Sequence, residues 1–241
     1  MTEKASHELR APNSDDEWRA YHAIFPPLLR ARACPCSSHW PERSADFEHS
    51  MFLIRRPSTR EIEEFIKQSI DLPLSYDQIG LAKQSPSDFS FDQARATIGQ
   101  GKPVFERSKL ALREWRHFEM GWVEIFPKNA SIEPGTTLAV LVHHLGFWSL
   151  NGCRVVYELD KQPGDTRFGF AYGTLTNHAE MGEEVFEVSI SPESEEVSYC
   201  IRAASKPRAV LARMGYPLTR LLQARFRRGS LAAMQHAVGK Q

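Results

Sequence analysis

Residues 168–188 read FGFAYGTLTNHAEMGEEVFEV, which looks like a strand, a turn and a second strand. Its two ends are rich in aromatic residues and valine, whereas its middle is polar. Two apolar runs on either side of a short polar segment are typical of antiparallel strands joined by a turn. We therefore predict a β-hairpin here, with His178, Glu180 and Glu183 as ordinary solvated residues of its turn. The alternative for this dense turn is an acid/base or metal site.

Other segments of strand length lie on both sides of the hairpin. They are rich in Val, Ile, Phe, Tyr and Thr, and Gly, Pro, Asn or Asp residues bound them. Their connections are short, which favours antiparallel neighbours because parallel strands need a longer crossover. The segments are FDQARATIG (91–99), GWVEIFP (121–127), TTLAVLVHHLGFW (136–148), NGCRVVYELD (151–160) and EVSYCIRAAS (196–205).

Helical patterns occur before, between and after these strands. Ser58 or Thr59 can cap a helix that begins near residue 59, and Pro103 suits the first turn of a helix over 101–118. After Pro207, apolar residues recur at helical spacing. The order predicts an α+β fold in which one curved antiparallel sheet of about seven strands grips a long C-terminal helix. The apolar positions of that last helix are Leu218, Leu222, Phe226, Ala233 and Ala237.

The chain divides into two parts of different composition. Residues 55–240 carry the regular pattern and are predicted to form one domain, whereas residues 1–54 are predicted to be a partly disordered appendage. The spacing of Cys34 and Cys36 fits neither a redox nor a zinc motif, so we expect no metal and no cofactor. The scattered cysteines favour a cytoplasmic protein with reduced thiols.

Charge and hydropathy exclude two classes of partner. Lys plus Arg and Asp plus Glu both total 30, so no net field favours nucleic acid. No apolar run reaches the length of a membrane span. Acidic residues crowd 180–196 and basic residues crowd 202–241, and we expect these stretches to face each other or to be separately solvated.

Several motifs together resemble a family of uncharacterised proteins, a DUF/UPF family that shares a domain of unknown function. The resemblance runs from about residue 55 to 238 and implies no activity. The order of the elements also resembles the START-like and birch-pollen-allergen-like helix-grip proteins, which implies an apolar ligand cavity between sheet and helix. The family motifs are YDQIG (76–80), IGQGKPVFERSKLALREW (98–115), NGCRVVYELD (151–160), FGFAYGTLTNHAEMGEEVF (168–186) and SKPRAVLARMGYPLTRLLQARFRRGSLAAM (205–234).

Candidate catalytic residues are Glu184, His143 and His144. Adjacent residues of a strand point to opposite faces, so at most one of Glu183 and Glu184 can face a cavity, and Glu184 shares the parity of Phe186. The same rule allows only one of the two histidines to point inward. An inward carboxylate or imidazole could act as an acid or base, and a structural role is the alternative.

Candidate ligand-binding residues follow from the same alternation. Tyr157, Tyr172 and Tyr199 each have apolar residues two positions away, so each phenol can enter the cavity or serve the core. Arg154 interrupts an apolar strand and needs a polar partner such as Glu184, Glu158 or Asp160, or it can clamp a ligand anion. Phe170 and Phe186 complete the predicted cavity wall.

These observations support three functions. The first is binding of a small, largely apolar or amphipathic molecule between the sheet and the C-terminal helix. The second is an enzyme of the cyclase, isomerase or hydrolase kind that uses the same cavity. The third is a protein-interaction module that uses the basic helix and the acidic strands.

Overall fold

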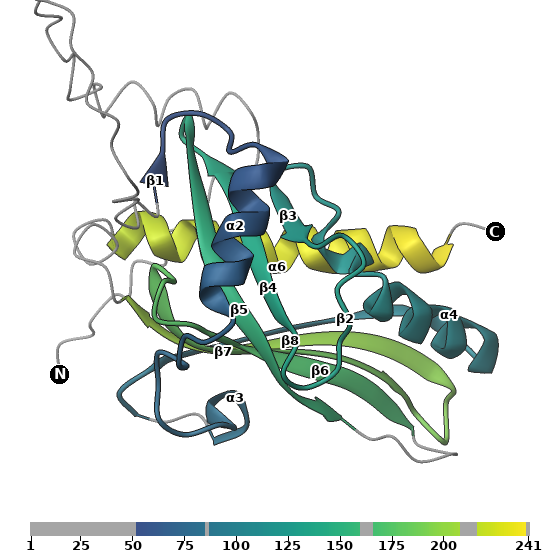
Figure 1. Ribbon diagram of the computed structural model, residues 1–241. Helices are drawn as coiled ribbons and strands as arrows, with labels where there is room; N and C mark the ends of the chain where they lie inside the picture. The colour runs from purple at the N-terminus through teal and green to yellow at the C-terminus, as the bar shows by residue number, and fades with distance from the viewer. Residues whose placement is uncertain (1–51, 85–86, 160–165, 208–215, 240–241) are drawn as a thin grey trace, which may run out of the picture. The chain divides into compact units, whose positions relative to one another are not determined.

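The structure of the protein, a computed structural model, describes residues 52–84, 87–159, 166–207 and 216–239. Nearly all of the appendage predicted for residues 1–54 lies outside these described residues, as does the pair Cys34 and Cys36. The described residues form an antiparallel sheet of eight strands with helices packed on it (Figure 1). The strands are β1 (Phe52–Leu53), β2 (Ser90–Gln100), β3 (Val123–Phe126), β4 (Thr137–His144), β5 (Phe147–Leu159), β6 (Arg167–Thr174), β7 (Glu180–Ile190) and β8 (Glu196–Pro207).

The strands from β3 to β8 pair in chain order, each antiparallel to the next. β2 pairs with β8, which gives the order β2-β8-β7-β6-β5-β4-β3, and the short β1 pairs with the first part of β5. Short connections permit no other arrangement, because a parallel neighbour requires a crossover. The predicted α+β fold, a sheet of about seven strands with a long C-terminal helix, is confirmed.

Local sequence signals account for the helix ends. Ser58 caps the first helix in a reciprocal box: its hydroxyl accepts the N–H of Glu61 at 3.3 Å, and the Glu61 carboxylate accepts the N–H of Ser58 at 2.8 Å. The helix predicted for 101–118 is broken at Trp115, whose φ of 57° is left-handed. The helices are α2 (Thr59–Ser69), α3 (Leu81–Gln84), α4 (Lys102–Arg113), the 3₁₀ helix η1 (Arg116–Phe118) and α6 (Tyr216–Gly239).

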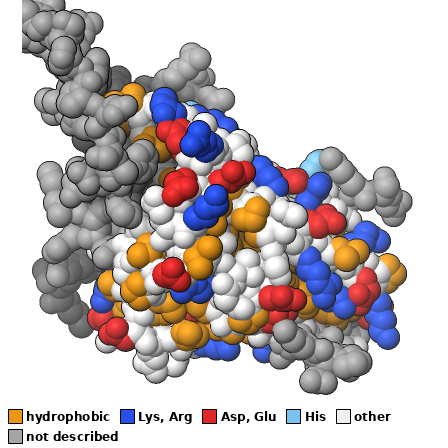
Figure 2. Space-filling view, in the orientation of Figure 1, with side chains coloured by type: hydrophobic (Ala, Val, Ile, Leu, Met, Phe, Trp, Pro, Cys, Tyr) orange, Lys and Arg blue, Asp and Glu red, His pale blue; other side chains and the backbone are white. Residues whose placement is uncertain are grey.

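Both faces of the sheet bury apolar side chains. We call the face that packs against α4, η1 and α6 the inner face, and Phe170 and Phe186 are fully buried there. On the opposite, outer face, Ala171 and Val185 pack beneath the segment 74–82. Helix α2 covers β4 and β5 on this outer face. Figure 2 shows acidic and basic side chains interspersed over the side drawn, in keeping with their equal totals of 30.

The two halves of α6 pack differently on the inner face. Ser230, Met234 and Val238 are buried to 2% exposure or less, so the C-terminal half closes against the sheet and α4. Side chains of the N-terminal half, such as Leu222 and Phe226, are only half-buried. The space beside that half is the site described next.

Candidate functional site

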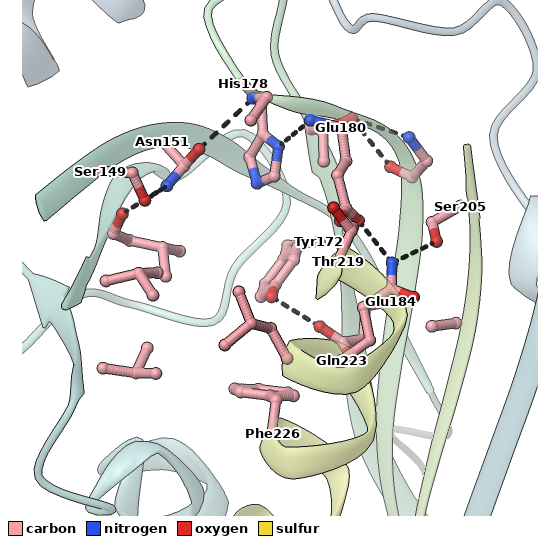
Figure 3. Close-up of a pocket in the computed structure, with 18 of the residues that line it drawn as sticks. Ser149, Asn151, Tyr172, His178, Glu180, Glu184, Ser205, Thr219, Gln223 and Phe226 are labelled. Atoms are coloured by element: carbon pink, nitrogen blue, oxygen red, sulfur yellow. Dashed lines mark hydrogen bonds between the residues drawn. The ribbon is translucent and has the colours of Figure 1, made fainter. Parts of the chain in front are cut away.

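A cavity of about 290 Å³ lies between the inner face of the sheet and the N-terminal half of α6 (Figure 3). One wall comes from β4 and β5, and a second comes from β6, β7 and β8. Helix α6 forms the third wall, and Trp122 lies just before β3. The apolar wall residues are Trp122, Val123, Val140, Val142, Leu222 and Phe226; the polar ones include Ser149, Asn151, Tyr172, Glu180, Glu184, Ser205, Gln223 and Arg227.

Glu184 and Tyr172 form the central polar pair of the cavity. They stand opposite each other on β7 and β6, and the Tyr172 hydroxyl donates to Glu184 Oε2 at 2.7 Å. Burial raises the pKa of Glu184 to about 7, although the hydrogen bond from Tyr172 and the charge of Arg227 oppose this rise. Burial also raises the pKa of Tyr172 far above its usual value, so the phenol remains a donor. Glu184 therefore changes protonation near neutral pH, inside the cavity.

A second carboxylate, Glu180, lies in the same cavity. The Gln223 side-chain amide of α6 donates to Glu180 Oε2 at 2.8 Å and to Ser205 Oγ at 3.0 Å. Burial raises the pKa of Glu180 as well. The expectation that Glu180 lies in a solvated turn is wrong, because β7 begins at Glu180 and strand parity brings this side chain to the inner face.

Two arginines of α6 lie beside these carboxylates and share one partner. Arg220 holds Asp92 of β2 through two hydrogen bonds of 2.5 and 2.7 Å, and Arg227 lies 3.2 Å from the same carboxylate. Arg227 also lines the cavity. These arginines therefore fasten α6 to β2, at the boundary of the cavity.

His143 and His144 are adjacent in β4 and point to opposite faces of the sheet, as the alternation of a strand requires. His144 lines the cavity, whereas His143 is exposed and stacks on Trp148 with ring centroids 4.2 Å apart. Burial, together with the neighbouring His143, lowers the pKa of His144. His178 also lines the cavity, and its Nδ1 accepts the N–H of Glu180 at 2.9 Å. No group of three or more His, Cys, Asp or Glu residues in the described ranges could hold a metal ion.

Glu183 lies on the outer face and is only 3% exposed, so its prediction as a solvated turn residue is also wrong. Its carboxylate accepts hydrogen bonds from the Tyr157 hydroxyl at 2.7 Å and from the N–H of Gly80 at 2.8 Å. The Tyr76 hydroxyl and the N–H of Ala82 donate at 3.2 and 3.3 Å. Glu183 thus fixes the segment 76–82 to the sheet.

Tyr157 does not point into the cavity, contrary to the expectation from its spacing. The register of β5 against β6 shifts between Val155 and Tyr157, as in a β-bulge. The extra residue reverses the alternation, so Val155 faces inward while Tyr157 packs on the outer face and reaches Glu183. An irregular pairing of this kind leaves no clear mark in the sequence of a single strand.

Tyr199, Phe170 and Phe186 point inward, but they belong to the packed core. Each has 0% exposure, and none of them lines the cavity. The Tyr199 hydroxyl lies 2.9 Å from Ser230 Oγ of α6, which satisfies it away from any ligand. The alternative that these residues serve the core is the one that their placement supports.

Arg154 faces outward and binds the end of α2. Its guanidinium donates to the carbonyl oxygens of Ile70 at 2.6 Å and Ser69 at 3.2 Å, and to Thr137 Oγ1 at 3.2 Å. The last carbonyls of a helix lack partners within the helix and carry negative partial charge, so a cation there is favourable. Of the carboxylates suggested as its partner, Asp160 lies outside the described residues.

Sequence reasoning did not place Gln223, Glu180 and Arg227 in the cavity, although a signal for each of them was present. In α6 the positions 219, 222, 223, 226 and 227 follow one face at helical spacing, and all of them line the cavity. Glu180, Glu184 and Phe186 are separated by even numbers of residues in β7, so the alternation of the strand places all three on the same face. The apolar pattern alone therefore does not reveal the polar residues on the cavity-facing sides of α6 and β7.

The chain is an α+β helix-grip domain, and its largely apolar cavity ends in two half-buried carboxylates, Glu180 and Glu184. The chain belongs to the family described as Domain of unknown function (DUF1990), which matches residues 75–233. A UPF0548 protein of Dictyostelium discoideum is 32% identical over 208 residues, covering 78% of this chain and 96% of that protein. A UPF0548 protein of Arabidopsis thaliana is 34% identical over 152 residues, with coverages of 61% and 73%.

Among solved structures, a hypothetical protein from Helicobacter pylori superposes with a TM-score of 0.45 and 12% identity, covering 68% of this chain and 98% of that chain. Within the described residues, no helix is both long and apolar enough to span a membrane. The family description names no activity, so a function has to be argued from the cavity itself.

Proposed function

We propose that the protein binds a small, largely apolar molecule in the cavity between the sheet and α6. The observation that carries this proposal is the cavity of about 290 Å³, with Val140, Val142, Leu222 and Phe226 among its walls. Ligand sites are concave, mostly apolar, and carry a few converging polar groups that orient the ligand. The volume is just below the range of about 300–1,000 Å³ that is usual for such sites, so the ligand is small.

The polar end of the ligand would meet Tyr172 and Glu184. Both line the cavity, and they converge on each other from neighbouring strands. The other residues predicted for the site would act indirectly: Tyr199, Phe170 and Phe186 support the inner face, while Tyr157 and Arg154 hold elements on the outer face. Of the six residues predicted to bind ligand, the proposal keeps Tyr172 alone. It adds Glu184, which was predicted as a catalytic candidate, together with Gln223 and Phe226.

Filling the cavity tests this proposal. In a Leu222→Trp variant the larger ring would occupy the space beside α6, whereas Leu110→Trp, at a site on α4 that is 55% exposed, is the matched control. Native mass spectrometry would identify any co-purifying small molecule, and melting curves would be recorded with a library of apolar compounds. We expect compounds that raise the Tm of the wild type and of Leu110→Trp but not of Leu222→Trp. If no compound stabilises the wild type, or if Leu222→Trp responds equally, the proposal is wrong.

Acid/base catalysis on a bound ligand is a second candidate function, and one observation favours it. Burial places the pKa of Glu184 at about 7, which is the range in which a carboxyl group can exchange protons with a substrate at neutral pH. Tyr172 could donate a hydrogen bond to a developing oxyanion. For a substrate found by the screen, Glu184→Gln should then abolish turnover while binding persists; unchanged turnover would exclude this role of Glu184.

A further inference from the structure

Carboxylates outnumber guanidinium groups among the described residues at the polar end of the cavity. Three carboxylates meet there, from Asp92, Glu180 and Glu184, and two guanidinium groups face them, from Arg220 and Arg227. Both guanidinium groups bind Asp92 directly. Among the described residues, the side-chain donors to Glu180 and Glu184 are neutral groups, namely the Gln223 amide and the Tyr172 hydroxyl. If all three acids are ionised, the described residues at this end of the cavity carry one more negative charge than positive charge.

The other titratable groups that the structure describes near Glu184 are two histidines, a cysteine and a second tyrosine. His178 accepts a hydrogen bond at Nδ1 from the N–H of Glu180, so this nitrogen carries no proton. Burial lowers the pKa of His144, which keeps its ring neutral. Cys153 and Tyr199, which also face Glu184, are buried and neutral because burial raises the pKa of each.

We propose that the ligand of this cavity carries a positively charged nitrogen, which lies beside Glu184 and Glu180 while its apolar part contacts Phe226 and the valines of β4. This inference rests on the proposed binding function and specifies the ligand class as an apolar amine. One oxygen of Glu184 accepts from Tyr172, and within the described residues its other oxygen has no donor. That oxygen is where an ammonium group would donate, as a charge-assisted hydrogen bond of the strong kind.

Because the pKa of Glu184 is raised, binding of an amine should also release protons. Without a ligand near pH 7, the excess negative charge is partly neutralised by a proton on Glu184. An ammonium group that binds there stabilises the carboxylate, lowers the pKa of Glu184 and displaces the proton to solvent. The amine keeps its own proton, so binding releases a fraction of one proton near pH 7.

Isothermal titration calorimetry with decylamine, decanol and decanoate, which share one chain and differ in head group, tests the inference. Each compound would be titrated below its micelle concentration into the full-length protein at pH 7, in two buffers with different heats of ionisation. We expect decylamine to bind about tenfold or more tightly than decanol, because of one charge-assisted hydrogen bond, and decanoate to bind most weakly. The heat of decylamine binding should depend on the buffer, which reports the released proton.

Two variants test whether decylamine binds at Glu184. Glu184→Gln should reduce decylamine affinity about tenfold, abolish the buffer dependence and leave decanol affinity unchanged. Glu133→Gln, at an exposed position, should behave like the wild type. Circular dichroism would establish that both variants are folded, and Glu180→Gln provides a second test from the same strand.

The outcomes separate this inference from the proposed function. Decanol binding as tightly as decylamine, or decanoate binding most tightly, would overturn the amine and leave an apolar binding site standing. Decylamine binding without buffer dependence, or with equal affinity in Glu184→Gln, would also overturn it. If none of the three compounds binds, the proposed function loses its support and the inference falls with it.

Discussion

Glu183 and Glu184 are neighbours in β7, and they point to opposite faces of the sheet. Glu184 faces the cavity, whereas Glu183 accepts four hydrogen bonds on the outer face. Buried carboxylates are tolerated only when donors replace the lost water, and Glu183 meets this requirement fully. A single step along one strand therefore separates a structural acid from a candidate ligand-binding acid.

Glu183→Gln should destabilise the protein by about 2–4 kcal/mol, because an amide NH₂ would face donors where the carboxylate oxygen now accepts. Urea unfolding at pH 7 measures the change in free energy. Glu133→Gln, which removes a charge at an exposed position, should change it by less than about 0.5 kcal/mol. A loss below about 1 kcal/mol in Glu183→Gln would show that these hydrogen bonds contribute little.

At this scale the sequence predicted part of the site. Alternation correctly placed Glu184 and Tyr172 inward, because β6 and β7 pair there without a register shift. The same rule failed for Tyr157, because the bulge in β5 reverses the parity after Val155. It also failed to connect Glu183 with Tyr76, which is 107 positions away in sequence. Long-range partners are set by the tertiary fold and have no local pattern.

At the scale of elements, α6 shows why the fold was easier to predict than its packing. Its length and its apolar period predicted a long helix on the sheet, as found. The buried residues of its C-terminal half are Ser230, Met234 and Val238, however, and the predicted stripe of Ala233 and Ala237 missed them. Periodicity defines a helix face to within one position, and the partner surface decides which residues at its edge are buried.

Met234→Ala should destabilise the protein by about 2–5 kcal/mol, because it leaves a cavity in a part of the core that has no exposure. Thermal and urea unfolding would measure the loss. The exposed neighbour His236, changed to Ala, is the matched control and should have an effect below about 0.5 kcal/mol. Similar values for the two variants would mean that this half of α6 does not hold the fold together.

At the scale of the whole molecule, two buried groups make stability depend on pH in opposite directions. His117 of η1 is fully buried among Trp115, Phe118, Phe186 and Tyr199. Among the described residues, neither of its ring nitrogens has a hydrogen-bond partner. Burial lowers its pKa from 6.5 to about 3, whereas burial raises that of Glu184 from 4.5 to about 7.

Each shift defines its own pH window. The neutral His117 ring contributes stability above pH 6.5, and this contribution is lost as the pH falls toward about 3. The protonated Glu184 contributes stability below pH 4.5, and this contribution is lost as the pH rises through about 7. At about 1.4 kcal/mol per pKa unit, the contribution of His117 changes by about 5 kcal/mol across its full window, and that of Glu184 by about 3–4 kcal/mol.

His117→Phe and Glu184→Gln should therefore tilt the stability profile in opposite directions. From pH 4.5 to 7, the free energy of unfolding of the wild type should rise by about 2–3 kcal/mol relative to that of His117→Phe. Over the same range it should fall by about 2–3 kcal/mol relative to that of Glu184→Gln. Urea titrations between pH 4 and 8 measure both slopes. Glu133→Gln, at an exposed position, is the matched control. Parallel profiles for all proteins would show that neither buried group titrates as its surroundings imply.

The unequal packing of α6 has a consequence for its backbone amides. The half that carries Met234 and Val238 can open only with the core, so its amides should exchange with solvent hydrogen as slowly as global unfolding permits. The half around Leu222 and Phe226 borders empty volume, so its amides should exchange faster. Occupation of the cavity would slow the second group alone. The exchange rates of individual amides in α6 would then reveal that a ligand is bound, even before that ligand is identified.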